Sequence, residues 1–587
     1  MLLPAFAVLV SGVLSLRASV KLNQYVTVEG LSTRVGDRTI HQFTGIPYAT
    51  RETLLTRPKA VVYPDRKKVT IDATTPGFVC PSDTNWSASL DGFHAKLMHA
   101  LTDVNGAVQD GLKCTSLDIY VPATPGKKAI VVFVHGGALN FGARNQAVNR
   151  ADQIHRFDEF AETMWVSVGY SLGPLGFWAK ATEDGGIEAN AALHEIILAL
   201  LWVHAYAASF GGDLDNITLM GHSAGAALAQ DADFALRNPA YHGFGKRQPF
   251  HKLILMSGTS YLFPPIGMEE ALARQQQVID EAGCRKARDP LACLQRLSGK
   301  EIMEAASRAK FVGGPVIDND ALLGDADFHL RNGLFLKKVS VLITTAAEEC
   351  GMHCSELKED IMTLGHGIWE HLGHGDLVRD FKSSYPSSNF GGCNYQCAIR
   401  CTTDAVFVGP ALDSANYYRE GGRSVYTYEL SCELERLHAL VSLLNGAMEL
   451  GNVVAKVLRD VLPPEERPLV PVGFELLGQL FSPKAKKPPL PQVSEMGTFH
   501  GLDLALLFDA NVSKNGAYHV GLFTSREKAI AAFQPFFDFI FAGIATTKPP
   551  RENLFPTQCV DVPLVVRKLY TGEAKASLAA RKAAVRP

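Results

Sequence analysis

A strong excess of charge of one sign is absent from this sequence. Lysine and arginine total 57 and aspartate and glutamate total 60 over 587 residues, so the formal net charge is only −3. Without a basic excess the chain lacks the electrostatic character of a nucleic-acid-binding protein, and we expect no nucleic-acid partner. Internal repeats are also absent. Hydrophobic residues make up 47% of the chain, which is enough for a large core.

Long hydrophobic runs are scarce as well. Beyond the N-terminus no apolar stretch is long enough to cross a bilayer, so we expect no transmembrane segment. The basic, polar tail over residues 561–587 lacks the hydrophobic end of a GPI signal. The apolar run over residues 2–16 is too short to span a membrane and ends in small residues, which is typical of a signal peptide. We therefore predict a signal peptide over residues 1–18 and a secreted protein; the alternative is a buried N-terminal strand.

Cysteine is present in a number that fits an oxidising compartment. The chain has 11 cysteines, and the odd count leaves one thiol free or paired with another molecule. Cys393, Cys397 and Cys401 are spaced four apart, which would suit a metal or cluster, but a secreted chain favours disulfides. No cofactor or metal is predicted. Glycosylation sequons occur at Asn85, Asn216 and Asn511, and we expect Asn216 to stay unmodified because it lies in an apolar run.

Apolar segments of two kinds alternate along the chain. Short runs rich in β-branched residues predict buried strands, and longer runs with helical spacing predict helices. The predicted strands cover residues 129–134, 164–170, 216–220, 253–256 and 339–344, and the predicted helices cover 191–208 and 224–231. This alternation indicates an α/β fold, with a mostly parallel central sheet and helices on both faces.

A candidate nucleophile lies between one of these strands and the helix that follows it. Ser223 is the centre of Gly-His-Ser-Ala-Gly at residues 221–225. The strand before it and the small-residue helix after it match the strand–turn–helix context of a nucleophile elbow. The helix N-terminus favours negative charge that develops at this serine. The alternative is a glycine-rich turn with an idle serine, which this context makes the weaker interpretation.

A second glycine-rich turn follows the strand at residues 129–134. His-Gly-Gly-Ala at residues 135–138 lies upstream of the serine, where a loop of oxyanion-hole donors belongs. Such donors stabilise the negative oxygen of a tetrahedral intermediate. We assign this role to the N–H groups of Gly137, Ala138 and Ala224; a plain Gly-Gly turn is the alternative.

Further motifs occur between residues 43 and 430. They are FTGIPYA at 43–49, CTSLDIYVP at 114–122, YSLGPLGF at 170–177, ALLWV at 199–203, FGGD at 210–213, TDAVF at 403–407 and YTYEL at 426–430. In this set the chain resembles the type-B carboxylesterase/cholinesterase family of α/β-hydrolases. The resemblance implies an α/β-hydrolase fold and a carboxylic ester hydrolase that acts through an acyl-enzyme on a small-molecule or lipid ester.

The resemblance also implies the partners of the serine. It aligns Glu349 with the family's acid, with Glu348 as the fallback, and His500, in His-Gly-Leu-Asp-Leu, with its base. His500 would take the proton from Ser223 while Glu349 orients the imidazole. His222 adjoins the nucleophile but points away on a sharp elbow; we interpret it as an influence on substrate choice. The resemblance implies two short-loop disulfides, Cys80–Cys114 and Cys284–Cys293.

The sequence departs from the family pattern at several positions. Ser171 replaces a family arginine, which leaves Glu195 without its usual partner. Because a buried unpaired carboxylate is costly, we expect Glu195 to have found another donor or to be partly exposed. No residue matches the choline-site tryptophan; the nearest, Trp86, lies close to Cys80, which argues against choline esters.

The largest departure is an insertion before His500. Residues 433–492 form a helical and then proline-rich segment within the predicted catalytic domain, which we place at residues 19–560. One hypothesis makes the insertion a mobile lid in contact with a lipid interface, which would favour bulky apolar esters; the other makes it a packed surface elaboration. Two further functions stay open: a non-catalytic adhesion or scaffold protein, and a lipase or amidase of the same fold.

Overall fold

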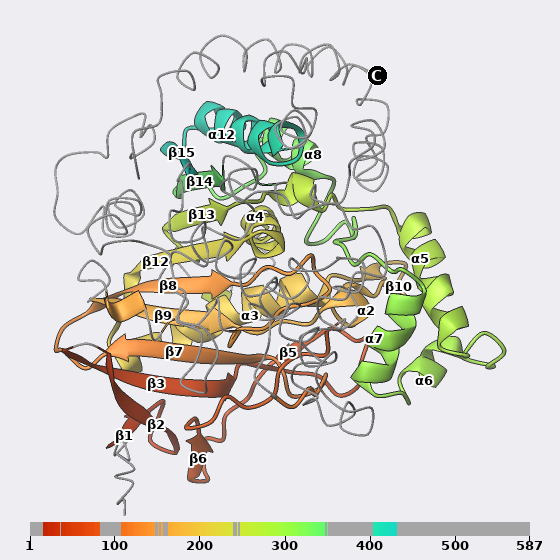
Figure 1. The fold of residues 1–587 in the computed structure, drawn as a ribbon. Helices are drawn as coiled ribbons and strands as arrows, with labels where there is room; N and C mark the ends of the chain where they lie inside the picture. Colours follow the sequence, from red (N-terminus) through yellow and green to blue (C-terminus); the bar gives the residue numbers. More distant parts are fainter. Residues whose placement is uncertain are drawn as a thin grey trace, which may run out of the picture.

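The structure is a computed structural model, and Figure 1 shows its fold. The described residues are 16–35, 37–82, 107–146, 151, 154–156, 162–238, 243–244, 247–346, 349 and 403–430. The predicted insertion at 433–492, the tail at 561–587, His500 and Trp86 lie outside them, as do Cys393, Cys397, Cys401, Asn85 and Asn511.

One large twisted sheet organises the described residues. Its order is β1-β2-β3-β7-β9-β8-β12-β13-β14-β15, with β6 paired to β2. Its strands are β1 (Leu16–Lys21), β2 (Val26–Val35), β3 (Arg38–Pro47), β6 (Val69–Asp72), β7 (Ser116–Pro122), β8 (Lys128–Val134), β9 (Thr163–Val168), β12 (Gly212–His222), β13 (Lys252–Met256), β14 (Ser340–Ala346) and β15 (Val425–Leu430). From β9 to β15 every pairing is parallel, whereas β1, β2, β3, β7 and β9 pair antiparallel.

Helices follow the parallel strands along the chain. They are α2 (Gly173–Phe177), α3 (Ala191–Tyr206), α4 (Ala224–Ala235), α5 (Met268–Glu281), α6 (Pro290–Leu294), α7 (Gly299–Arg308), α8 (Ala326–Arg331) and α12 (Gly409–Glu420). Every residue of β7, β8, β9 and β13 is buried, so both faces of the sheet are covered there. The predicted mostly parallel α/β sheet is confirmed, and each predicted strand and helix is present with shifted ends.

Strand β9 ends earlier than predicted. β9 ends at Val168, so Tyr170 lies beyond the strand rather than within it.

The predicted core strand around Asn216 is β12, and the Asn216 side chain is buried and accepts a hydrogen bond from Lys252 Nζ at 2.6 Å. A buried, bonded amide is a poor acceptor for a glycan, so we retain the expectation that Asn216 is unmodified.

Two hydrophobic segments bear on membrane and export predictions. The 20 residues Ala191–Phe210 are apolar enough to cross a membrane by composition and length, but 67% of their most apolar stretch is buried within the fold. At the N-terminus, Leu16, Arg17 and Ala18 already pair with β2. The predicted signal peptide over residues 1–18 therefore overlaps β1, and cleavage before Leu16 would keep this strand whole.

Glu195 has found another donor, as expected from the loss of the family arginine. Arg51, just after the short strand β4 (Ala49–Thr50), forms an ion pair with Glu195 on α3, and both side chains are almost fully buried. The Ser171 amide donates to Glu195 Oε2 at 2.7 Å, and the Ser171 hydroxyl lies 3.0 Å from Oε1. Arg51 and Ser171, from two different segments of the chain, therefore supply the donors of this buried carboxylate.

Candidate active site

Ser223 occupies the turn between β12 and α4. Its φ and ψ angles are 55° and −124°, a backbone conformation that residues with a Cβ rarely adopt. The Ser223 N–H donates to Met256 O at 2.8 Å, and the Ser223 carbonyl accepts from the amides of Ala226 and Ala227 at 2.9 and 3.1 Å. The strained backbone is therefore fixed from both sides, and the serine stands at the N-terminus of α4 with 7% of its surface exposed.

Two glycines make this sharp turn sterically feasible. A Cβ on Gly221 would lie 2.1 Å from Gly225 O, and a Cβ on Gly225 would lie 2.2 Å from Val134 O. Neither position has room for a side chain, so the motif spacing is a packing requirement. The second contact also brings the start of α4 against the end of β8, where the predicted oxyanion loop begins.

The loop after β8 packs directly against the nucleophile turn. A Cβ on Gly136 would lie 3.0 Å from Ser223 Cβ and 3.0 Å from His222 Nδ1. Among the described residues, the N–H groups of Gly137, Ala138 and Ala224 donate to no backbone carbonyl. The first amide of a helix has no partner within that helix. Three amides from two segments are therefore available close to the serine.

The predicted acid lies on the same edge of the sheet as the serine. Glu349 is fully buried three residues after β14, and its Oε1 accepts a hydrogen bond from the Ala346 amide at 2.7 Å. β12 and β14 run parallel on either side of β13, with His222, Met256 and Thr344 in register. With neighbouring strands about 4.8 Å apart, the two strand ends are separated by roughly 10 Å. A histidine side chain placed between them could contact both.

The remaining predicted residues divide into two groups. His500 and Glu348 lie outside the described residues, so the assignment of the base, and the choice of Glu349 over Glu348, stay predictions. Both disulfides implied by the family resemblance are present: Cα atoms are 4.8 Å apart in Cys80–Cys114 and 5.8 Å apart in Cys284–Cys293. Within the described ranges no group of three His, Cys, Asp or Glu side chains could hold a metal ion.

A buried polar cluster lies further along α4. The Asp231 carboxylate is fully buried and accepts a hydrogen bond from Ser260 Oγ at 2.6 Å, while its second oxygen has no partner among the described residues. Two residues on, Asp233 accepts from Arg423 at 2.8 and 2.6 Å. Burial raises the pKa of Asp231 to about 7, and the Ser260 hydrogen bond opposes this only partly.

Replacing Asp231 with asparagine should therefore stabilise the protein in alkaline solution. The folded state holds the Asp231 proton more tightly than the unfolded chain, so the free energy of unfolding falls as the pH rises from about 4 to about 7. Asp231→Asn should raise this free energy by up to about 4 kcal/mol at pH 8, and leave it nearly unchanged at pH 4. Urea unfolding at both pH values measures the change.

Asp233→Asn is the matched control on the same helix. It leaves Arg423 buried without its charged partner, so it should destabilise the protein at pH 8. Equal effects of the two substitutions, or a gain for Asp231→Asn that does not depend on pH, would contradict the assigned ionisation of Asp231.

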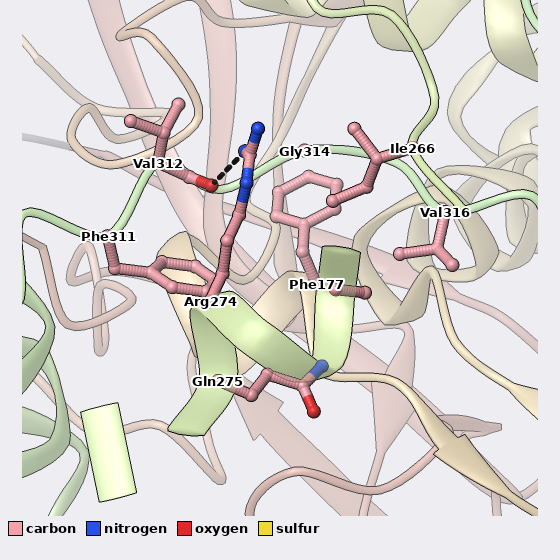
Figure 2. A pocket seen from close by; sticks show the side chains of 9 residues that line it. Phe177, Ile266, Arg274, Gln275, Phe311, Val312, Gly314 and Val316 are labelled. Carbon is pink, nitrogen blue, oxygen red and sulfur yellow. Dashed lines mark hydrogen bonds between the residues drawn. The ribbon is translucent and has the colours of Figure 1, made fainter. Parts of the chain in front are cut away.

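A small pocket lies beside α5 (Figure 2). The space in it that a water molecule could occupy is only about 10 Å³, and Phe177, Phe311, Ile266 and Val316 provide much of its apolar lining. Arg274 donates to Val312 O at 3.1 Å and closes one wall. Such a space holds roughly one water molecule, far less than a ligand site, and none of the predicted site residues lines this pocket. We do not assign it to the ester substrate.

Two buried contacts were not predicted from the sequence. Tyr170 lies in the YSLGPLGF motif at residues 170–177, where the sequence assigned it no contact. In the structure its hydroxyl donates to His135 O at 2.7 Å. Arg51 was not singled out at all, because a lone arginine after a short strand carries no pattern. Only the spatial neighbourhood of each residue reveals its partner.

The model of the carboxylesterase family matches residues 17–534. Para-nitrobenzyl esterase of Bacillus subtilis (strain 168) is 27% identical over 415 residues, which is 67% of this chain and 74% of that protein. Neuroligin-2 of Mus musculus is 24% identical over 440 residues, 66% of this chain but only 50% of neuroligin-2.

The solved structures agree with this assignment at the level of the fold. A PNB esterase structure superposes with a TM-score of 0.61 at 20% identity, and the match covers 90% of this chain and 92% of that one. The fold is therefore that of the α/β-hydrolases, with the turn at Ser223, the loop after β8 and the buried Glu349 on one edge of the sheet. From its strand order, its site geometry and the extent of the family match, this chain belongs to the carboxylesterase family.

Proposed function

We propose that the protein is a secreted serine carboxylic-ester hydrolase that works through an acyl-enzyme. The observation that carries the proposal is the strained Ser223 turn, against which Gly136 packs and beside which three amides are available. Family membership and the resemblance to para-nitrobenzyl esterase support an ester as the substrate. The two disulfides favour an oxidising compartment.

The proposed chemistry assigns one role to each group. His500 accepts the Ser223 hydroxyl proton while Oγ attacks the ester carbonyl, and Glu349 stabilises the imidazolium. The carbonyl oxygen becomes an oxyanion that the N–H groups of Gly137, Ala138 and Ala224 stabilise. His500 returns the proton to the departing alcohol, which leaves an acyl-Ser223. Water then attacks the acyl carbon, His500 takes its proton, and the carboxylic acid is released as Ser223 recovers its hydrogen.

Labelling with a fluorophosphonate tests whether the serine is reactive. The wild-type protein should be labelled once, with the adduct on the tryptic peptide that contains Ser223, because an activated hydroxyl displaces fluoride from phosphorus. Ester and matched amide substrates then separate an esterase from an amidase, and we expect turnover of the ester only. If the folded protein does not react with the fluorophosphonate, this result would instead support a scaffold role.

The similarity to neuroligin-2 keeps the non-catalytic alternative in view. Non-catalytic members of such a family would typically lack one of the three catalytic residues, whereas this chain retains Ser223, Glu349 and His500 in the expected order. This retention favours the enzyme. A protein that binds a partner but neither reacts with the fluorophosphonate nor hydrolyses esters would reverse the preference.

The insertion at residues 433–492 yields a separate prediction about substrate choice. If it is a lid, deleting residues 433–490 while keeping His500 should change the preferred acyl chain length by at least several fold, because the lid would contact the acyl chain. A series of p-nitrophenyl esters from acetate to palmitate measures this preference. An unchanged series from a folded deletion variant would support the surface elaboration.

A further inference from the structure

The donor loop has an unusual backbone that its surroundings must hold. Gly137, Ala138 and Leu139 have φ angles of 124°, 48° and 62°. Two of these three residues carry side chains in a region that favours glycine, and such conformations persist only where neighbouring groups over-determine them. The contacts that hold this loop therefore decide where its N–H groups point.

Each donor N–H shares a rigid plane with the carbonyl of the preceding residue. The Gly137 N–H and the Gly136 C=O belong to one planar peptide and point in opposite directions. His135 Nδ1 lies 2.8 Å from Gly136 O. Because a carbonyl can only accept, Nδ1 carries the hydrogen and donates it. The His135 ring thus sets the orientation of the peptide that presents the Gly137 N–H.

The neighbouring donor is held by the backbone alone. Gly137 O accepts hydrogen bonds from the amides of Asn140 and Phe141 at 3.0 and 2.9 Å. The same peptide presents the Ala138 N–H, which is fixed in the same manner. The two donor peptides therefore differ: a substitution can remove the support of the first, because that support is a side chain.

Tyr170 in turn holds His135. The two rings stack with their centroids 4.4 Å apart and their planes at 22°. The Tyr170 hydroxyl donates to His135 O at 2.7 Å, and both side chains are buried. Burial also lowers the pKa of His135 to about 4, so the ring is neutral near pH 7 and keeps the tautomer with hydrogen on Nδ1.

We propose that His135 is a positioning residue that orients the Gly137 N–H toward the substrate oxyanion, and that Tyr170 holds His135 in place. The assignment rests on the proposed function, since it concerns the same reaction. Hydrogen bonding at Gly136 O also polarises that peptide and makes its N–H a better donor. His135 itself touches no reacting atom in this scheme.

The test compares His135→Leu, which removes the donor, with His135→Asn, whose side-chain amide can restore an N–H close to the position of Nδ1. We expect His135→Leu to lower kcat for a p-nitrophenyl ester by roughly 10- to 100-fold with KM within about threefold, since misplaced donors act on the transition state. His135→Asn should recover most of that loss. Tyr170→Phe should show a smaller loss of the same kind.

Inhibition by a trifluoromethyl ketone separates positioning from a general loss of structure. Its adduct with Ser223 carries an oxyanion, so the inhibition constant should rise by the same factor as kcat falls in each variant. Tyr418→Phe, which removes another buried hydroxyl, bonded to Asp233 at 2.9 Å, should change neither quantity.

The proposal is overturned if His135→Leu keeps wild-type kcat, if inhibitor affinity does not follow kcat, or if His135→Asn is no better than His135→Leu. If His135→Leu does not fold, Tyr170→Phe decides the matter by the same two measurements, because it retains the ring. Failure of the proposed function is recognised separately, because the wild type would then hydrolyse no ester or Ser223→Ala would remain active.

Discussion

Replacing Ser223 with alanine should reduce kcat for a p-nitrophenyl ester by roughly 10⁴- to 10⁶-fold, the range expected when a triad nucleophile is lost. The substitution removes the only atom that forms the acyl-enzyme bond in the proposed mechanism. The residual rate reflects binding and the oxyanion donors, which the variant keeps. A stopped or continuous assay of p-nitrophenol release measures kcat for both proteins.

The fold should tolerate this substitution. The Ser223 side chain forms no cap hydrogen bond to α4, and alanine fits wherever serine fits. The denaturant midpoint of Ser223→Ala should therefore stay close to that of the wild type, so that lost turnover reports chemistry. Ser414→Ala is a matched control: Ser414 is buried on α12, contacts Gln230 at 3.3 Å, and should affect kcat by less than about threefold.

Glu349→Gln tests the proposed acid by the same measurement of kcat. A neutral amide cannot stabilise the imidazolium and can favour the wrong histidine tautomer, so kcat should fall by up to about 10⁴-fold. Full activity in Glu349→Gln together with a dead Glu348→Gln would transfer the acid to Glu348. Activity above about 1% of wild type in Ser223→Ala would remove the nucleophile assignment itself.

Replacing Arg51 with methionine should lower the free energy of unfolding by about 3–5 kcal/mol at pH 7, the usual consequence of leaving one buried charge without its partner. Arg51 and Glu195 have side chains that are 1% and 0% exposed. Arg51 also donates to Leu175 O at 3.0 Å, which the variant loses. Burial already raises the pKa of Glu195 and Arg51 lowers it, so without Arg51 this pKa should rise further.

The double variant Arg51→Met/Glu195→Gln and an exposed pair make this prediction specific. The double variant should regain part of the loss, because no buried charge is left without its partner. Arg17→Met breaks a pair of the same chemistry with Glu29, but Arg17 is 74% exposed and the loss should not exceed about 1 kcal/mol. Similar losses for Arg51→Met and Arg17→Met, measured by urea unfolding, would show that the buried pair contributes little.

Much of the fold could be predicted because the relevant information is local. Strands β8 and β13, and β12 over residues 217–220, consist mostly of apolar β-branched or aliphatic residues, and both of their faces are buried. The turn at Ser223 depends on Gly221 and Gly225, whose spacing along the chain is itself the packing requirement. Element ends were less accurate, as Tyr170 shows, because the ladder with a neighbouring strand decides where a strand stops.

The sequence by itself determined the α/β class, the sharp turn at Ser223 and the glycine-rich turn after β8, since each depends on residues only a few positions apart. The pairing of Arg51 with Glu195, of Tyr170 with His135 and of Gly136 with Ser223 was decided only by the tertiary structure. The last two contacts require β9, β8 and β12 to lie side by side, in an order that differs from their order along the chain. Such an order arises from the packing of whole strands and helices, and no short pattern of residues encodes it.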